Sequence, residues 1–150
     1  MRRLRNAVLG VLVTGVLSIP YVASGQAQPE AQGQSSYKDA PVLCVWEVLL
    51  ATQLVADKCH VGEDPALQAE LASSIKRVDG FISANDATAT PDKVAAFKQS
   101  FRDQSSSPDF CSNQQAQAMY ADAKRAGADR IRTDTDQLVS VPRKPTKEGC

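Results

Sequence analysis

Apolar positions along the chain fall into four long segments, and the first is apolar on almost every side. From Pro41 to Cys59, only three residues interrupt the apolar run before the last turn: Glu47, Thr52 and Gln53. The valines would also suit a β-strand, but the length of the segment favours a helix. A helix without a polar face is buried on most sides. We therefore predict a central helix that begins after Asp39 as N-cap, with Pro41 in its first turn.

The second segment has the spacing of an amphipathic helix. Asp64 is a suitable N-cap, and Pro65 suits the first helical position. Apolar residues then follow in steps of four, four, three and four, which is a helical stripe, at Leu67, Leu71, Ile75, Val78 and Ile82. The opposite face is charged and is expected to face solvent; it carries Glu70, Lys76, Arg77 and Asp79.

The third segment repeats this start signal. Thr90 is a suitable N-cap, and Pro91 suits the first helical position. Val94, Phe97 and Phe101 then share one face. The sequence SSSP that follows Gln104 is expected to end this helix.

The fourth segment predicts a single long helix. Ser112 and Gln115 have the spacing of a capping box at its start. Asp134 interrupts the helical stripe that follows, which consists of Ala116, Tyr120, Ala123, Gly127, Ile131 and Leu138. Beyond it, Pro142 and Pro145 exclude a helix. We expect an extended tail from about residue 141 to Cys150.

Strand signals are almost absent, so the predicted fold is all-α. Four helices joined by short loops are most simply arranged as an up-and-down bundle. Residues 28–38, rich in Gln, Ser, Gly and Ala, are predicted to be a flexible linker. Residues 39–150 then form one helical domain. Its core is expected to contain most of the aromatic residues, namely Trp46, Phe81, Phe97, Phe101 and Tyr120.

The first 27 residues have the layout of a secretory signal peptide. Three arginines precede the uncharged, mostly apolar stretch Ala7–Ile19, and small residues follow Pro20. The stretch is short of the roughly 20 residues needed to cross a bilayer. Cleavage is expected after Ser24 or Ala27. The mature protein should therefore be periplasmic or secreted, with no stable membrane insertion.

Cleavage also changes the charge of the protein. The full chain has 17 basic and 17 acidic residues, and the leader removes three arginines. The mature chain then has 14 basic and 17 acidic residues, a net charge of −3. A mildly acidic chain does not suit nucleic acid or an anionic membrane as a partner.

Four cysteines in an exported chain indicate two disulfides. Cys44 and Cys59 lie on the first predicted helix, where fifteen residues span about 22 Å. A disulfide needs Cα atoms within about 7 Å, so these two cannot pair. In an up-and-down bundle Cys111 lies at the same end as Cys59, and Cys150 returns to the end that holds Cys44. The expected disulfides are Cys59–Cys111 and Cys44–Cys150.

The single histidine, His60, follows Cys59, and this order is found where haem c is attached. Attachment normally uses C-x-x-C-H, whereas this chain reads ADKCH. It would also leave an odd number of cysteines. A zinc site is not expected either, because the chain has no CxxC pair and no second histidine. We predict no cofactor and no metal, and a partly exposed His60 at the end of the first helix.

No catalytic set is evident in the sequence. No nucleophile elbow surrounds a serine. Asp134 and Asp136 lack the glycine and glutamate of a calcium-binding loop. Glu47, between Trp46 and Val48, either faces the core as a candidate site or marks the one wet edge of its helix.

These observations lead to a functional hypothesis drawn mainly from what the sequence lacks. We expect an exported, non-enzymatic helical protein that binds another protein of the cell envelope as an adaptor, an inhibitor or a chaperone-like factor. The alternative is a carrier of a small apolar ligand held between helices. An enzyme that uses Glu47 is the third hypothesis.

Overall fold

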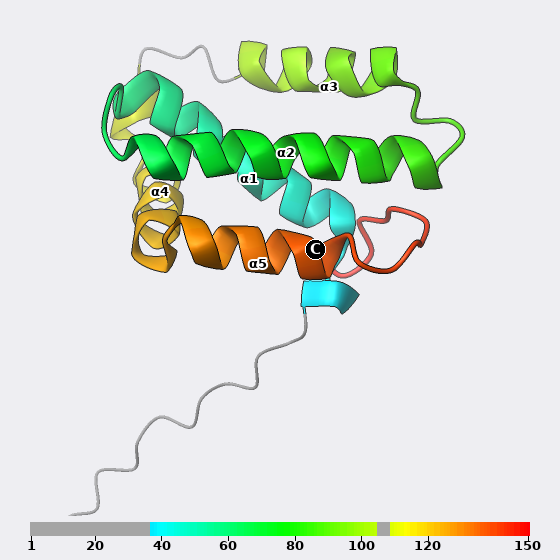
Figure 1. Ribbon diagram of the computed structural model, residues 1–150. Coiled ribbons are helices and arrows are strands. Elements are labelled where there is room, and N and C mark those ends of the chain that lie inside the picture. Colours follow the sequence, from blue (N-terminus) through cyan, green and yellow to red (C-terminus); the bar gives the residue numbers. More distant parts are fainter. Residues whose placement is uncertain (1–36, 105–108) are drawn as a thin grey trace, which may run out of the picture. The chain divides into compact units, whose positions relative to one another are not determined.

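The computed structural model describes residues 37–104 and 109–150. The predicted signal peptide, residues 1–27, and nearly all of the predicted linker lie outside these residues. Within them the fold is all-helical, as the sequence predicts, with no strand (Figure 1). The elements are η1 (Tyr37–Asp39), α1 (Val42–Cys59), α2 (Pro65–Asn85), α3 (Pro91–Gln104), η2 (Phe110–Ser112), α4 (Gln114–Ala126) and α5 (Ala128–Leu138).

Helix α1 is central, because α2, α3 and α4 all pack against it. Its buried side chains supply much of the core and include Val42, Trp46, Leu49, Leu50, Leu54 and Val55. Asp39 is not the N-cap, contrary to the prediction, because it lies in η1. Pro41 precedes the helix without a side-chain cap, and the carbonyl of Thr146 accepts from the Leu43 amide at 3.2 Å. A distant backbone group therefore performs part of the capping.

Helices α2 and α3 begin where the sequence predicts, at Pro65 and Pro91. Asp64 precedes α2 in the left-handed region, with φ of 46°, and its side chain makes no cap hydrogen bond. Its carboxylate is turned to Lys124 of α4 instead, with Oδ2 2.8 Å from Nζ. At the start of α3, Thr90 Oγ1 accepts from the Lys93 amide at 3.4 Å, in the manner of an N-cap.

The predicted fourth helix is wrong in two respects. The chain divides into α4 and α5 at Gly127, whose φ is 81°. Glycine adopts such an angle without steric cost, so the apolar stripe continues while the backbone turns. Ser112 is not the cap, because it lies in η2; Asn113 Oδ1 accepts from the Ala116 amide at 3.0 Å. A simple four-helix up-and-down bundle is therefore not confirmed.

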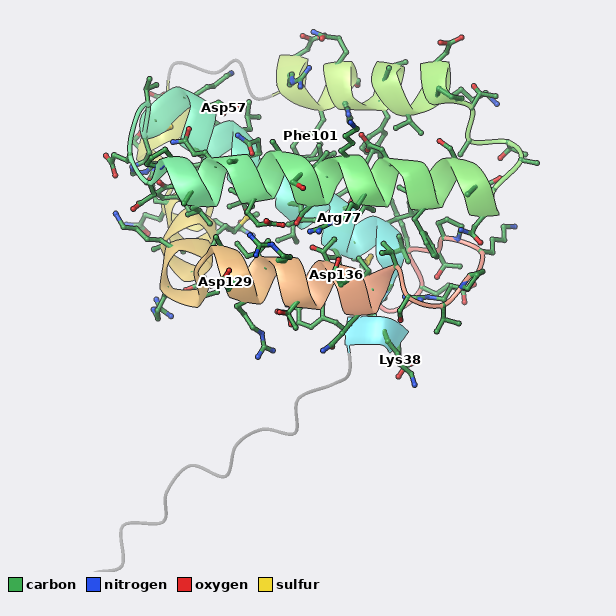
Figure 2. The ribbon with its side chains drawn as sticks, in the orientation of Figure 1. Lys38, Asp57, Arg77, Phe101, Asp129 and Asp136 are labelled. Carbon is green, nitrogen blue, oxygen red and sulfur yellow. A yellow bond between two sulfur atoms is a disulfide. The ribbon has the colours of Figure 1, made fainter. Side chains whose placement is uncertain are left out.

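Helix α5 runs alongside α2 in the same direction. Arg132 of α5 pairs with Glu70 of α2. Further along both helices, Asp136 pairs with Arg77, so the two helices run in the same direction. Figure 2 shows Arg77 and Asp136 between the two helices. Leu138 and Thr135 of α5 are buried in this contact.

Two disulfides join the ends of α1 to later parts of the chain. Cys59 is bonded to Cys111 with Cα atoms 5.5 Å apart, and Cys44 to Cys150 with Cα atoms 5.8 Å apart. These are the pairs expected from the sequence. The segment after α5 folds back to α1, since Arg143 Nη2 donates to the Ala40 carbonyl at 3.0 Å. None of the helices in residues 37–104 and 109–150 is long and apolar enough to cross a membrane.

Candidate binding surface

Trp46 of α1 is one of the residues that attach helix α3 to the rest of the domain. The Trp46 ring stacks on Phe97 of α3 with centroids 4.8 Å apart. Its Nε1 donates to Asp79 Oδ1 at 2.8 Å, and Asp79 Oδ2 lies 2.5 Å from Lys98 Nζ of α3. Asp79 thus links α1, α2 and α3, although the sequence placed it on a solvent face. Phe97 is 37% exposed and is not the core residue predicted.

Among the described residues, one side of α1 stays open between α3 and α4. Val48, in the middle of this apolar helix, is 52% exposed. A hollow of about 320 Å³ lies over it, and we call this hollow the α1 groove. Its floor is α1 and its walls include Phe101 of α3 and Met119 of α4. Its lining residues are Cys44, Glu47, Val48, Ala51, Phe101, Met119 and Cys150.

Glu47 marks the polar edge of the α1 groove. Its side chain is 29% exposed and forms an ion pair with Lys147 of the C-terminal segment. The nearby Cys44–Cys150 disulfide holds that segment against α1. Of the two interpretations left open by the sequence, the geometry favours a wet helix edge over a carboxylate enclosed in the core.

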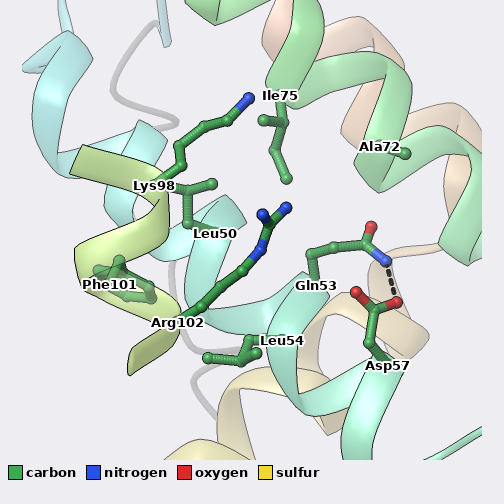
Figure 3. A pocket seen from close by; sticks show the side chains of 9 residues that line it. All are labelled: Leu50, Gln53, Leu54, Asp57, Ala72, Ile75, Lys98, Phe101 and Arg102. Atoms are coloured by element: carbon green, nitrogen blue, oxygen red, sulfur yellow. Dashed lines mark hydrogen bonds between the residues drawn. The ribbon is translucent and has the colours of Figure 1, made fainter. Parts of the chain in front are cut away.

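A second hollow, of about 280 Å³, lies between α1, α2 and α3 (Figure 3). We call it the α3 hollow. Its apolar lining consists of Leu50, Leu54, Ala72, Ile75 and Phe101, and its polar lining of Gln53, Asp57, Lys98 and Arg102. Gln53 Nε2 donates to Asp57 Oδ1 at 2.6 Å. The other amide atom, Gln53 Oε1, is buried and has no hydrogen-bond partner within the described residues.

His60 is engaged in structural contacts. Its ring stacks on Tyr120 with centroids 4.0 Å apart, and Nε2 lies 2.8 Å from Gln117 Oε1. Gln117 Nε2 donates to the Cys111 carbonyl, and the Oε1 of the same amide faces His60. Cys59 is bonded to Cys111 and offers no thiol for haem attachment. His60 is partly exposed, as expected, and joins the end of α1 to α4.

The sequence analysis missed a buried carboxylate in α2. Glu70 is only 6% exposed, and its oxygens accept from Ser74, Arg77 and Arg132 at 3.1, 2.7 and 2.9 Å. Burial by itself raises the pKa of the Glu70 carboxyl. The hydrogen bonds from Arg132 and Ser74, with the charges of Arg77 and Arg132, outweigh burial and hold this pKa below its ordinary value. The spacing of Glu70, Ser74 and Arg77 along one helix face was the available signal.

The remaining acidic candidates are dispersed. Asp134 pairs with Arg130 at 2.8 Å and Asp136 with Arg77 at 3.2 Å. Across the part of the chain that the structure describes, no three His, Cys, Asp or Glu side chains gather to hold a metal ion. Comparison of the chain with protein-family models, curated proteins and solved structures gives no match. The geometry of the two hollows is therefore the basis for assigning a function.

Proposed function

We propose that this chain is an exported, non-enzymatic protein that binds another protein of the cell envelope through the α1 groove. The observation that carries the proposal is the exposure of Val48. This valine lies in the middle of the most apolar helix, yet it is 52% exposed and lies between Phe101 and Met119. Contiguous exposed apolar patches mark interaction sites on soluble proteins.

The composition of the α1 groove supports a protein partner. Aromatic residues and methionine are enriched at protein interfaces, and Met119 can adapt to the shape of a partner. The ion pair between Glu47 and Lys147 supplies a polar edge, which matches the polar rim of known interfaces. Both disulfides begin on α1, so the floor of the groove is held at its two ends.

The proposed location is the periplasm or the extracellular space. Two disulfides persist in oxidising compartments and are rare in the cytosol. The predicted signal peptide, residues 1–27, supports the same location. The intact mass of the protein from its native envelope, before and after reduction, tests both points. A mass that includes residues 1–27, or two free thiol pairs, would contradict this location.

The binding proposal is tested with two valine variants. Val48→Asp places a charge in the α1 groove, whereas Val61→Asp does the same at a 79% exposed position in the loop between α1 and α2. Pull-downs from envelope extract should recover a specific partner with the wild type and Val61→Asp but not with Val48→Asp. Circular dichroism should show equal folding of all three. No specific partner for the wild type, or equal recovery by both variants, would refute the proposal.

The α3 hollow favours a second candidate, a carrier of a small apolar ligand. Its lining joins five apolar side chains with four polar ones, and ligand pockets likewise combine apolar walls with polar groups that orient the ligand. Native mass spectra of the protein purified from its own envelope should then show a bound small molecule. A spectrum of the bare chain alone would count against this candidate and leave the α1 groove proposal standing.

A further inference from the structure

We infer that the α3 hollow binds an anionic amphiphile, with a single alkyl chain lying against its apolar wall and a carboxylate or phosphate head group held by Arg102. The inference rests on the second proposed function and deepens it by naming the chemistry of the ligand. The decisive feature is the Arg102 guanidinium, which lies over the apolar wall of the hollow and has no ion-pair or hydrogen-bond partner among the described residues.

The walls of the α3 hollow suit an alkyl chain. Leu50 and Leu54 come from α1, Ile75 and Ala72 from α2, and Phe101 from α3. The volume of about 280 Å³ lies just below the range for small-molecule pockets, roughly 300–1,000 Å³. A short or medium alkyl chain therefore fits better than a branched or polycyclic molecule.

Arg102 differs from the other arginines that the structure describes. Its side chain extends from α3 across the hollow toward Gln53 and Ile75 (Figure 3). Within residues 37–104 and 109–150 it makes no ion pair and no hydrogen bond. Each of the others is bound to a carboxylate or a backbone carbonyl, namely Arg77, Arg125, Arg130, Arg132 and Arg143. Arg102 is exposed, so a ligand reaches its donors directly.

The other charged groups of the hollow are already bound to protein groups, so Arg102 is the residue expected to bind the anion. Lys98 is paired with Asp79 at 2.5 Å. Asp57 accepts a hydrogen bond from Gln53 and has no ion pair with Arg102. Arg102 is therefore the cation of the lining whose donors are left for an anionic head group. A guanidinium binds carboxylate and phosphate oxygens through two parallel hydrogen bonds.

Helix α3 also gives the site a built-in reporter. Trp46, the only tryptophan of the chain, stacks on Phe97 of α3. A ligand that wedges between α3 and the α1–α2 surface changes this stacking. Tryptophan fluorescence therefore reports occupancy without a label.

The test is titration of the folded protein with four probes, below the concentrations at which they form micelles. Decanoate and decyl phosphate carry the anionic head groups, whereas decanol and decylamine carry the same chain without a negative charge. Trp46 fluorescence and calorimetry both measure binding. We expect both anions to bind at least tenfold more tightly than decanol or decylamine, and the tighter anion identifies the head group.

Two variants assign the effect to the hollow. Arg102→Gln should weaken binding of the anions about tenfold or more and bring it near that of decanol. Ala72→Phe fills the hollow from an exposed position on α2 and should weaken all probes alike. Arg125→Gln is the control. It removes the same charge from an exposed position on α4 and should leave binding unchanged.

The outcomes distinguish the anionic ligand from the more general proposal of an apolar-ligand carrier. Binding of decanol that equals that of decanoate, or binding that Arg102→Gln leaves intact, would overturn the anionic ligand but keep an apolar carrier. Failure of every probe to bind would overturn both. Neither result bears on the α1 groove, which is tested separately with Val48→Asp.

Discussion

Helices α5 and α3 both pack against α2 (Figure 1), but different interactions hold them there. Helix α5 buries Leu138 and joins α2 through Glu70, whose carboxylate oxygens are bound by two arginines and a serine. Helix α3 buries Val94, stacks one partly exposed phenylalanine on Trp46 and borders a hollow. At the α5 contact the buried carboxylate of Glu70 is bound by protein groups, whereas Arg102 of α3 makes no ion pair or hydrogen bond within the described residues. We therefore expect α5 to contribute more to stability, whereas the proposed ligand contact lies on α3.

The largest expected effect lies on the α5 side. Glu70→Ala leaves Arg77 without its buried partner and removes the link to Arg132. Loss of one partner of a buried pair costs about 3–5 kcal/mol, and the half-exposed Arg132 reduces our expectation to about 2–3 kcal/mol. Urea unfolding measures the change in the free energy of unfolding. A loss below about 0.5 kcal/mol, the size expected of a surface substitution, would show that the buried network does not hold α5.

A smaller effect is expected on the α3 side. Val94→Ala removes two methyl groups from a side chain that is 7% exposed, at a cost of about 1–1.5 kcal/mol. Amide hydrogen exchange should show faster exchange throughout α3 and little change in α5, because α3 opens locally. Equal acceleration in both helices would mean that they unfold as one unit and would remove the distinction drawn above.

Acid should weaken the α5 side selectively. The pKa of Glu70 is lowered in the folded protein, so this carboxylate adds stability above its unfolded pKa, and that stability is lost as pH falls from about 5. Asp86 has a pKa lowered by hydrogen bonds from Thr88, so some acid dependence remains without Glu70. In Glu70→Gln, urea midpoints between pH 7 and about pH 3 should fall less than in the wild type. An identical pH profile would contradict the role given to Glu70.

The smallest effect on stability is expected from Arg102. Since this side chain is exposed and makes no ion pair or hydrogen bond in the described residues, Arg102→Gln should change the free energy of unfolding by less than about 0.5 kcal/mol. The same variant is expected to weaken binding of decanoate, so stability and binding separate at this residue. A marked loss of stability would indicate a structural role for Arg102 and weaken its assignment as a ligand contact.

The sequence predicted most of the helices because they follow from local spacing, whereas the choice of disulfide pairs also used an up-and-down arrangement that is not confirmed. Proline positions mark the starts of α2 and α3, and the length of α1 keeps Cys44 from Cys59. The break at Gly127 was missed because the apolar stripe continues through it. A glycine inside a predicted helix was the only local signal.

The candidate surfaces were not predictable in the same way. Glu70 resembles a solvated residue until Arg132, 62 positions later, is brought beside it. The exposure of Val48 depends on how far α3 and α4 stand apart, and no periodicity along α1 encodes that separation. Arg102 is one charged residue among several on α3. These features arise from tertiary packing, which local patterns do not specify.

Because the C-terminal segment returns to α1, the contacts of this helix form in a fixed order during synthesis. The Leu43 amide finds its acceptor only in Thr146, and Cys44 finds its partner 106 positions later, whereas Cys59 needs only the next 52. During synthesis Cys59 therefore meets its partner first, and the partner of Cys44 follows later in the chain. The earliest helix of the domain is thus the last to be completed. A chain cut short before Thr146 would leave the start of α1 without this acceptor and Cys44 without its native partner.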